Sequence, residues 1–324
     1  MFATSPVPVL PWLERDLARV EVALREAVAA ADPFLTQVAS HLVPAGGKRL
    51  RPSLALCVGQ LADSPVTDDV VMGACAVELV HMGSLYHDDV IDEAQTRRNV
   101  ESVNARWGNL VAILAGDFLL ARASEIAASL GTEVAGLLAM TIGRLCEGEV
   151  RELSQTFDVG RTQEAYLTSI EGKTAALMSA ACRIGALTAG LDRPRVEALT
   201  IYGTRVGMAF QIVDDVLDIV ATEEQLGKPS GNDLMEGVYT LPVILTLAAE
   251  TGEQLRPLLG KPLDRAAVEE ARALIRSNGA VASSLDVARQ FASEATDALE
   301  GFPDSPALEA LRSVGDHLIA AIPV

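Results

Sequence analysis

Apolar residues recur every three or four positions along most of the chain, which is the spacing that places them on one face of an α-helix. This pattern predicts helices at 9–31, 53–62, 67–92, 110–130, 134–153, 163–191 and 196–220. Turn-forming residues interrupt the pattern at Asp32-Pro33, Gly131, 157–160, 192–194 and 227–231. No run of alternating apolar and polar residues indicates a strand, so the sequence predicts an all-α protein.

The apolar character changes along the chain. The segments between 67 and 220 are apolar almost all round, which predicts a central layer of helices that other helices cover. Residues 251–324 are more polar and predict outer helices. No low-complexity linker divides the sequence, so we expect a single domain over residues 1–324.

The composition is that of a globular protein, with 49% hydrophobic and 22% charged residues. A formal net charge of −18 argues against nucleic acid or an anionic membrane as the main partner. No stretch of 18 residues is free of charge, so we expect no membrane span. The first residues lack the basic and apolar regions of a signal peptide.

The cysteines give a further indication of the compartment. Cys57, Cys75, Cys146 and Cys182 lie far apart in apolar segments and show no metal-binding spacing. They predict buried, reduced thiols and a cytoplasmic protein.

An acidic cluster ends the helix predicted at 67–92. Asp88 and Asp92 are four residues apart in the run HDDVIDEAQTRRN (87–99), so on a helix they point in the same direction. Two neighbouring carboxylates repel each other unless a cation lies between them, and Mg²⁺ is the usual ion when a phosphate supplies the other oxygens. A solvated acidic helix end is the alternative, and this motif alone does not exclude it.

The same pattern recurs in FQIVDDVLD (210–218), again at the end of an apolar helical segment. Asp214 and Asp218 share a face, as Asp88 and Asp92 do. If the two helices pack side by side, the carboxylates meet at one cavity and need metal ions to offset their repulsion. A solvated patch would not require apolar helices leading into both motifs, so the repetition favours a metal site.

Basic residues that suit phosphate oxygens lie near these motifs in the sequence. They are Lys48, Arg49 and Arg51 in GGKRLRP (46–52), Arg97 and Arg98 after the first motif, Lys173 beside Thr174, and Lys228 after the second motif. Any one of them alone is more typical of a solvated surface. GGKRLRP lacks the spacing of a P-loop and follows no strand, so we exclude that interpretation.

Taken in order, GGKRLRP, HMGSLYHDDVIDEAQTRRN, EGKTAAL, FQIVDDVLD, LGKPSGNDLMEG and TLP resemble the motifs of trans-isoprenyl diphosphate synthases, the polyprenyl synthetase family. The resemblance covers about residues 40–250. It implies the isoprenoid synthase fold, a bundle of long helices around a central cavity, and commonly a homodimer. It also implies an enzyme that joins isopentenyl diphosphate to an allylic diphosphate and so elongates an all-trans polyprenyl diphosphate.

The resemblance further implies roles for individual residues. The expected ligands of Mg²⁺, of which three ions are expected with substrate bound, are Asp88, Asp92 and Asp214, supported by Asp89, Asp215 and Asp218. The expected contacts of the allylic diphosphate are Arg97, Lys173, Thr174, Gln211 and Lys228. The expected contacts of isopentenyl diphosphate are Lys48, Arg51, His81 and Arg98.

The implied reaction begins with cleavage of the allylic C–O bond, where Mg²⁺ and the basic residues stabilise charge on the leaving diphosphate. An apolar cavity would shield the allylic cation from water. The isopentenyl double bond then attacks, and the departing diphosphate is expected to take the proton, because the sequence shows no strong side-chain base. The predicted catalytic residues are Asp88, Asp92, Lys173 and Asp214.

Two positions depart from the pattern of the family. Val238 stands where many members have a lysine before TLP, and Glu152 stands where many have a glutamine after GExx. The first departure leaves one accessory diphosphate contact in doubt. Neither changes the acidic motifs, so we expect activity to be retained.

The length of the product is expected to depend on the residues just before Asp88. Many short-chain members carry bulky aromatic residues four or five positions earlier, where this chain has Ser84 and Gly83. We therefore expect a medium-to-long product, such as a quinone side chain, rather than geranylgeranyl or farnesyl diphosphate. Further residues to examine are Met82 as a partial stop, and Ala139, Met140 and Gly143 as permissive positions on a neighbouring helix.

Two other functional classes remain open. A terpene cyclase would share the fold but usually has a different second metal motif, which FQIVDDVLD argues against. A non-catalytic subunit of a heteromeric synthase would tend to lose the acidic motifs, and both are intact.

For a synthase of long products, we also expect transient contact with a membrane when the product is released.

Overall fold

The computed structural model describes residues 5–62, 64–98, 100–222 and 230–323. Its α-helices are α1 (Pro11–Ala27), α2 (Pro33–Ala39), α3 (Leu50–Gly59), α4 (Asp68–Ile91), α5 (Val103–Trp107), α6 (Asn109–Ser129), α7 (Thr132–Leu153), α8 (Gln163–Ile170), α9 (Ala176–Thr188), α10 (Arg193–Val220), α12 (Asn232–Glu236), α13 (Leu241–Ala248), α14 (Gly252–Leu255), α15 (Arg265–Ser277), α16 (Ala280–Asp297) and α17 (Pro306–Ala320). A π-helix, η1 (Glu171–Ala175), lies between α8 and α9. The prediction of an all-α protein is confirmed.

The described residues also contain a small hairpin that the sequence pattern did not predict. Strands β1 (Thr96–Arg97) and β2 (Val100–Glu101) pair antiparallel in the loop that follows α4. Each strand has only two residues, which is too short for an alternating pattern to be seen.

The predicted ends of the longest helices agree with the structure, because local capping signals set them. Thr67 accepts a hydrogen bond from the Val70 backbone nitrogen and starts α4 at the predicted place. Asp192 caps α10 in the same way, and a proline occupies its first turn. Both acidic motifs consequently lie in the last turns of their helices.

The segment predicted as one helix over 163–191 is interrupted by η1. A side-chain carbon at Gly148 of α7 would lie 2.4 Å from the Lys173 backbone nitrogen, so only glycine allows α7 and η1 to approach this closely. A π-helical turn holds an extra residue and turns the side chains that follow in a new direction. This crossing therefore determines where Lys173 points.

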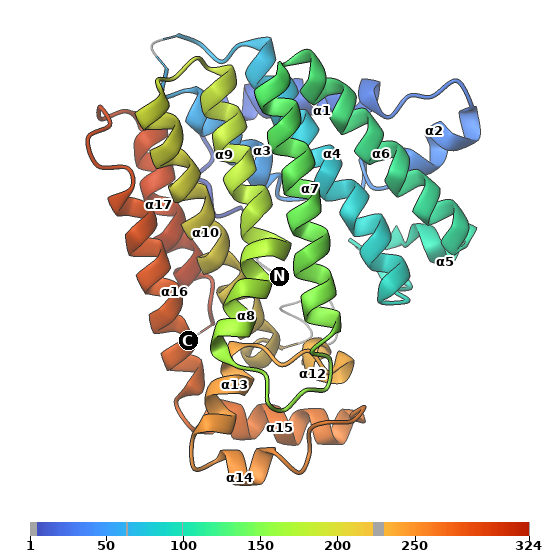
Figure 1. Ribbon diagram of the computed structural model, residues 1–324, viewed down its shortest axis with the longest axis vertical. Coiled ribbons are helices and arrows are strands. Elements are labelled where there is room, and N and C mark those ends of the chain that lie inside the picture. Colours follow the sequence, from blue (N-terminus) through green and yellow to red (C-terminus); the bar gives the residue numbers. More distant parts are fainter. Residues whose placement is uncertain (1–4, 63, 99, 223–229, 324) are drawn as a thin grey trace.

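The centre of the molecule is built from long helices packed side by side, α9 and α10 among them (Figure 1). α3 is buried along its whole length and packs against α4 and α9. A side-chain carbon at Gly207 of α10 would lie 2.5 Å from the Ala175 Cα. The acidic end of α10 is thus held close to η1 and Lys173.

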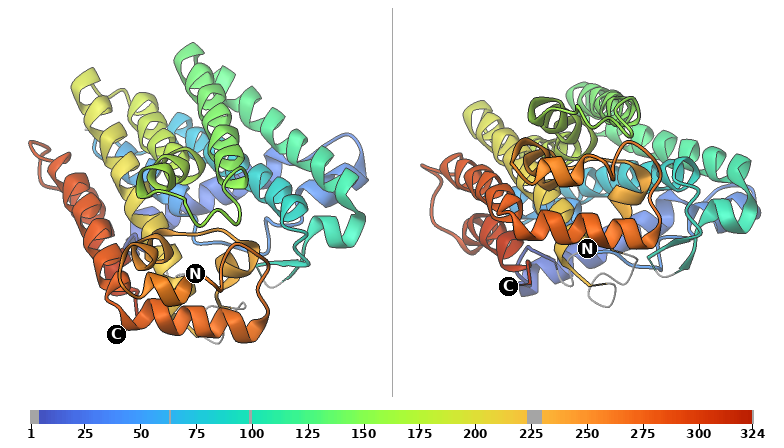
Figure 2. Two further views of the ribbon diagram at one scale, coloured as in Figure 1. Left: turned by 60° about the horizontal axis from the view of Figure 1, so that its bottom comes forward. Right: turned by 90° about the horizontal axis from the view of Figure 1, so that it is seen from below.

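One expectation about the central layer is wrong. α6 and α7 lie close together at one end and diverge toward the other (Figures 1 and 2), and among the described residues no helix covers the outer faces of the two. Their exposed apolar residues are Leu110, Ile113, Leu114, Met140, Val150 and Leu153. Cys146 of α7 is exposed as well, so the prediction of buried thiols holds for Cys57, Cys75 and Cys182 only. The apolar pattern does not distinguish a covered face from one that stays open in the single chain.

The more polar C-terminal part forms outer helices, as predicted. α16 and α17 lie along the flank opposite α6, and α12 to α15 close one end of the bundle (Figures 1 and 2). A small second apolar cluster joins this end to the end of α10 through Ile219, Leu234 and Tyr239. None of the described helices is both long enough and apolar enough to span a membrane.

Candidate active site

The two acidic motifs lie at the C-terminal ends of α4 and α10. The carbonyl groups at such an end carry partial negative charge, so carboxylates there raise the free energy of the folded state unless cations offset them. Asp88 is partly exposed and Asp92, the residue after α4, is exposed. In the second motif Asp214 is partly exposed, and Asp215 and Asp218 are buried.

Asp88 lies in an environment that opposes its ionisation. The pKa of this carboxyl is raised to about 7, chiefly by burial and also by the negative charges of Glu149 and Asp92, while Lys173 and Arg97 act in the opposite direction. An acid with this pKa at a cavity holds its negative charge at neutral pH only with the help of nearby cations.

Asp89 is turned into the protein. It is completely buried, and its Oδ1 accepts hydrogen bonds from Arg97 Nε at 2.7 Å and Arg97 Nη2 at 2.6 Å. Burial raises its pKa, and the guanidinium of Arg97 acts against that rise. Asp89 therefore orients Arg97 beside Asp88 and does not itself face the cavity with both oxygens.

The middle aspartate of the second motif has a similar place. Asp215 accepts hydrogen bonds from the Tyr166 hydroxyl at 2.5 Å and from Gln211 Nε2 at 2.8 Å. Thr174 donates in turn to Gln211 Oε1 at 2.7 Å. Burial raises the pKa of Asp215 to about 7, and the two donors act against that rise. Thr174 and Gln211, predicted as diphosphate contacts, are thus also links that orient Asp215.

The third aspartate of the second motif has a structural task that its sequence position did not reveal. The carboxylate of Asp218 is buried and accepts hydrogen bonds from the backbone nitrogens of Asn232 at 3.3 Å and Asp233 at 3.2 Å. Its two oxygens bind the first amides of α12, one each. The carboxylate of Asp218 thus secures the start of α12, and its supporting role in the metal shell stays a prediction.

Lys173 extends from η1 toward α7 and is held by two carboxylates. Its Nζ lies 2.9 Å from Glu149 and 2.5 Å from Glu152. These glutamates raise the pKa of Lys173 although burial opposes the rise, so the ammonium stays charged. Asp88 lies within reach of this charge. Lys173 is therefore a permanent cation beside the first acidic motif.

The four residues predicted to hold isopentenyl diphosphate come together from three separate segments. Burial lowers the pKa of Lys48 to about 8 and that of Arg51 to about 10, with Asp214 near the lysine and Asp88 near the arginine. Burial also lowers the pKa of His81 well below its usual value, and Arg51 and Arg98 lower it further, so this imidazole is neutral. The result is a compact basic cluster between the two acidic motifs.

Two members of this cluster show features that bear on an anion. Arg51 Nε is buried without a hydrogen-bond partner among the described residues. Arg98 donates a hydrogen bond to the Gly46 carbonyl oxygen and so lies against the GGKRLRP loop. A buried donor without a partner costs free energy that an anionic ligand would recover.

The acidic residues also bear on a metal ion. No group of three or more His, Cys, Asp or Glu side chains in the described ranges lies close enough together to form a metal site. Asp214 Oδ1 is nevertheless buried without a hydrogen-bond partner among these residues. Proteins commonly bind Mg²⁺ through one or two carboxylates together with substrate phosphates. The exposed and partly exposed aspartates therefore fit a divalent ion that arrives with a diphosphate.

The residues predicted to set product length differ in their surroundings. Ser84 is one turn before Asp88 on the same face of α4, and its hydroxyl donates to the His81 carbonyl oxygen at 2.9 Å. Gly83 instead faces α6, where a side-chain carbon would lie 3.1 Å from the Gly116 carbonyl oxygen. Gly83 is therefore a site of helix packing, and Ser84 is the position at which a larger side chain would lie below the acidic motif, on the same face of α4.

The other chain-length candidates are resolved by their burial. Met82 is completely buried. Ala139, Met140 and Gly143 are exposed on the outer face of α7, so the prediction that they leave room for a growing product is corrected. Lys228 lies outside the described residues.

Three residues of this region were not predicted from the sequence as site residues. Glu149 holds Lys173, Tyr166 holds Asp215, and buried Arg161 donates to the Tyr239 carbonyl oxygen at 3.1 Å and lies 3.9 Å from Glu152. The acidic run EGEVRE could have indicated Glu149. Nothing in the sequence around Tyr166 or Arg161 distinguishes them from ordinary helix and loop residues.

Comparison with known proteins identifies the family of this chain. A family model described as polyprenyl synthetase matches residues 32–275. The chain belongs to the polyprenyl synthetase family. It is therefore a trans-polyprenyl diphosphate synthase, a prenyltransferase that acts on isoprenyl diphosphates.

Individual relatives cover nearly all of the synthase. It is 40% identical to a nonaprenyl diphosphate synthase of Mycobacterium tuberculosis, over 94% of this chain and 92% of the relative. It is 39% identical to heptaprenyl diphosphate synthase component 2 of Geobacillus stearothermophilus, over 95% of this chain and 96% of the relative. Both names describe medium or long prenyl chains, in agreement with the product class predicted from the sequence.

A solved structure agrees with the fold. A polyprenyl synthase of Caulobacter crescentus, complexed with calcium and isoprenyl diphosphate, superimposes with a TM-score of 0.91 at 35% identity, over 97% of this chain and 98% of that chain. The isoprenoid synthase fold predicted from the sequence is confirmed. A divalent cation accompanies the diphosphate chemistry of this family.

Proposed function

We propose that the synthase uses Mg²⁺ to condense isopentenyl diphosphate with an allylic diphosphate and that it extends an all-trans chain to medium or long length. The observation that carries this proposal is the placement of the basic cluster between the ends of α4 and α10. The two acidic ends can together hold cations and one diphosphate, while the basic cluster holds the other diphosphate.

The allylic diphosphate is proposed to bind between the two acidic ends. Asp88, Asp92 and Asp214 would hold Mg²⁺, expected as three ions, which supplies charge stabilisation to the leaving diphosphate. Arg97 and Lys173 lie beside Asp88 and present fixed positive charge to the same group. Gln211 donates a hydrogen bond to Asp215, and Thr174 donates one to Gln211. The contact of Lys228 with the allylic diphosphate is proposed from the sequence alone.

Isopentenyl diphosphate is proposed to bind at Lys48, Arg51, His81 and Arg98. The neutral imidazole of His81 can donate one hydrogen bond to a phosphate oxygen without adding charge. The basic groups hold the diphosphate so that the isopentenyl double bond meets the allylic carbon. The proton lost after this step passes to the departing diphosphate, since the acids here are occupied with cations or buried donors.

Product length is proposed to depend on Ser84. Ser84→Phe places a ring one turn below Asp88, and we expect products shorter by several isoprene units. Ser84→Ala is the matched control, because it changes the same position without adding volume, and its products should keep their length. Gly83→Phe is a poorer test, because its ring would collide with α6. Unchanged product length in Ser84→Phe contradicts this assignment.

A homodimer is proposed on the apolar face of α6 and α7. The exposed side chains there include Leu110 at 71%, Met140 at 65% and Val150 at 63% exposure. Apolar residues gathered on one face of a protein are typical of an interface. Leu114→Glu should lower the mass measured by light scattering toward that of one chain, whereas the same change at Ile201, which is exposed on α10, should leave it unchanged.

The deciding experiment is incubation of the purified chain with Mg²⁺, isopentenyl diphosphate and a series of allylic diphosphates, with product length read by chromatography. Elongation to products of medium or long length supports the proposal. Products that stop at farnesyl or geranylgeranyl diphosphate support the short-chain alternative.

A second candidate follows from the name of one relative, heptaprenyl diphosphate synthase component 2. The chain would then be one component of a synthase that requires another. The same incubation separates the two candidates, because a chain that needs another component gives no elongation alone and gains it when that component is added. The single domain and the cytoplasmic location remain predictions from the sequence.

A further inference from the structure

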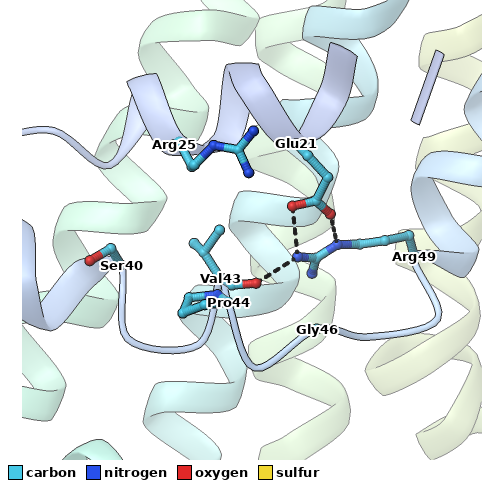
Figure 3. A pocket seen from close by; sticks show the side chains of 7 residues that line it. All are labelled: Glu21, Arg25, Ser40, Val43, Pro44, Gly46 and Arg49. Atoms are coloured by element: carbon cyan, nitrogen blue, oxygen red, sulfur yellow. Dashed lines mark hydrogen bonds and ion pairs between the residues drawn. The ribbon is translucent and has the colours of Figure 1, made fainter. Parts of the chain in front are cut away.

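Arg49 stands between Lys48 and Arg51 in the GGKRLRP loop, but its side chain turns away from both. Its guanidinium is buried, with 7% of the side chain exposed. Nε donates to Glu21 Oε1 at 2.5 Å, Nη1 donates to Glu78 Oε1 at 2.8 Å, and Nη2 donates to the Val43 carbonyl oxygen at 3.2 Å. Figure 3 shows the contacts with Glu21 and Val43. Arg49 thus joins the loop to α1 and to α4.

The backbone at Arg49 needs this support. Its φ of 45° and ψ of 37° lie in the left-handed region, which costs free energy for a residue with a side chain. Arg49 is also the residue from which α3 starts, so its conformation sets the direction of Lys48 on one side and of Arg51, in the first turn of α3, on the other. Releasing the guanidinium would let both neighbours turn.

Glu78 connects the loop to the rest of the basic cluster. It is 2% exposed and lies three residues before His81 on α4, so the two side chains share a face of that helix. The loop is contacted from its other side by Arg98, which donates to the Gly46 carbonyl oxygen. Arg49 and Glu78 therefore fix the positions of the four residues of the basic cluster relative to one another.

We propose that Arg49, Glu78 and Glu21 form a positioning device for the isopentenyl diphosphate site. None of the three touches the reacting atoms. They hold Lys48, Arg51 and His81 at fixed separations, so that the diphosphate meets all of them at once. This inference rests on the proposed assignment of the basic cluster to isopentenyl diphosphate.

The two glutamates contribute unequally, because their surroundings differ. Glu21 is 30% exposed and lies at the wall of an open cavity of about 470 Å³ that Val43, Pro44 and Arg49 also line. Water can reach it there and replace part of its contact. Glu78 is enclosed, so nothing replaces it. The device should therefore fail more completely when Glu78 is changed than when Glu21 is changed.

The test is steady-state kinetics in which each substrate is varied while the other is saturating. In Glu78→Gln we expect the KM for isopentenyl diphosphate to rise about tenfold, and in Glu21→Gln about threefold. The KM for the allylic diphosphate and kcat should each stay within about twofold, because the acidic ends are untouched. Equal increases in both KM values, or a fall in kcat alone, would overturn the proposal.

A matched control and a double variant separate positioning from general stability. Arg122→Met removes another arginine that ties a helix to α1, through the Ala27 carbonyl oxygen at 2.7 Å, far along the chain from the loop. It should lower Tm and leave both KM values unchanged. Arg49→Met with Glu78→Gln removes both buried charges, so Tm should recover relative to the single variants, while the KM for isopentenyl diphosphate stays raised. Recovery of that KM together with Tm overturns the proposal.

The remaining outcomes are also decisive. If Arg49→Met and Glu78→Gln fail to fold, Glu21→Gln, at the open cavity, carries the test, and an unchanged KM for isopentenyl diphosphate in that variant overturns the inference. If the unaltered chain elongates nothing, the proposed function fails first. If it elongates, and Lys48→Ala raises the KM for isopentenyl diphosphate but the glutamate variants do not, only the inference fails.

Discussion

The two acidic motifs have the same sequence pattern, but the fold uses them differently. In the first motif Asp92 is exposed beyond the end of α4. In the second motif the equivalent residue, Asp218, is buried and binds backbone nitrogens at the start of α12. In the first motif Asp88 and Asp92 are therefore at least partly exposed, whereas in the second motif only Asp214 is. The same sequence motif therefore places its third aspartate in two different environments.

The difference has a simple geometric cause. α4 ends at Ile91, within the motif, so Asp92 leaves the helix and reaches solvent. α10 continues to Val220, beyond its motif, and the first amides of α12 lie against Asp218. Asp218 consequently remains on the helix and faces α12. A helix that ends only a few residues further along leaves the equivalent aspartate buried instead of exposed.

The largest effect should come from the first aspartate of each motif, because these are equivalent in both. Asp88→Asn and Asp214→Asn should each lower kcat by about 10²–10³-fold, since each removes charge that would hold a cation against the leaving diphosphate. Folding should be kept, and circular dichroism checks this. If one of the two variants keeps more than a tenth of the activity, the motifs are not equivalent even at this position.

The next largest effect tests the difference itself. Asp92→Ala should reduce activity about tenfold or more without lowering the free energy of unfolding, because the side chain is exposed and is proposed to hold a cation. Asp218→Ala should lower the free energy of unfolding by about 0.5–2 kcal/mol, the usual value of a lost helix cap. Urea unfolding and initial rates, measured on the same preparations, check both.

A matched control exists for the second of these changes. Asp264 caps α15 by accepting a hydrogen bond from the Ala267 backbone nitrogen at 2.9 Å. Asp264→Ala should cost a similar free energy of unfolding without altering activity. A strongly destabilised Asp92→Ala, or an Asp218→Ala variant that loses activity at full stability, would reverse the comparison drawn here.

The sequence was sufficient for the regular parts of this picture. The apolar spacing and the turn-forming residues placed α4 and α10 within a few residues, and the repeated DDxxD pattern found both acidic ends. Lys48, Arg51, His81 and Arg98 were predicted to belong together and lie together. These successes rest on local signals or on motifs whose chemistry is narrow.

The failures all involve neighbours that are distant in sequence. The sequence around Asp218 gives no sign that its carboxylate binds the first backbone amides of α12. Gly83 was read as open space, but α6 fills it. Met140 and Cys146 were expected inside, but they face outward on α7. The apolar pattern of the sequence predicts which face of a helix is apolar, but the residues that pack against that face are known only from the folded structure.

A smaller effect should separate the middle aspartates. Asp89 accepts from the guanidinium of Arg97, whereas Asp215 accepts from the hydroxyl of Tyr166 and the side-chain amide of Gln211. Breaking the first contact leaves a charged group unpaired, and breaking the second leaves one carboxylate oxygen without one of its donors. Asp89→Asn leaves the guanidinium of Arg97 without its counter-charge and should cost about 1.5–3 kcal/mol of the free energy of unfolding. Tyr166→Phe removes one hydrogen bond and should cost about 1 kcal/mol. Urea unfolding at pH 8 measures both, and equal costs would show that the two environments are interchangeable.

The smallest effect concerns the lysine beside each motif, and it appears only as pH rises. Lys48, near Asp214, has a pKa lowered to about 8 by burial, so it loses its proton above that pH. The two glutamates beside Lys173 raise its pKa, so the lysine near the first motif stays charged throughout. The KM for isopentenyl diphosphate should therefore rise about five- to tenfold between pH 7 and pH 9, as the protonated fraction of Lys48 falls. Lys48→Arg should flatten this profile because arginine keeps its charge, whereas Lys173→Arg should leave the profile as it is. A profile that Lys48→Arg does not change would place the titrating group elsewhere, and the two lysines would then no longer distinguish the two ends of the site.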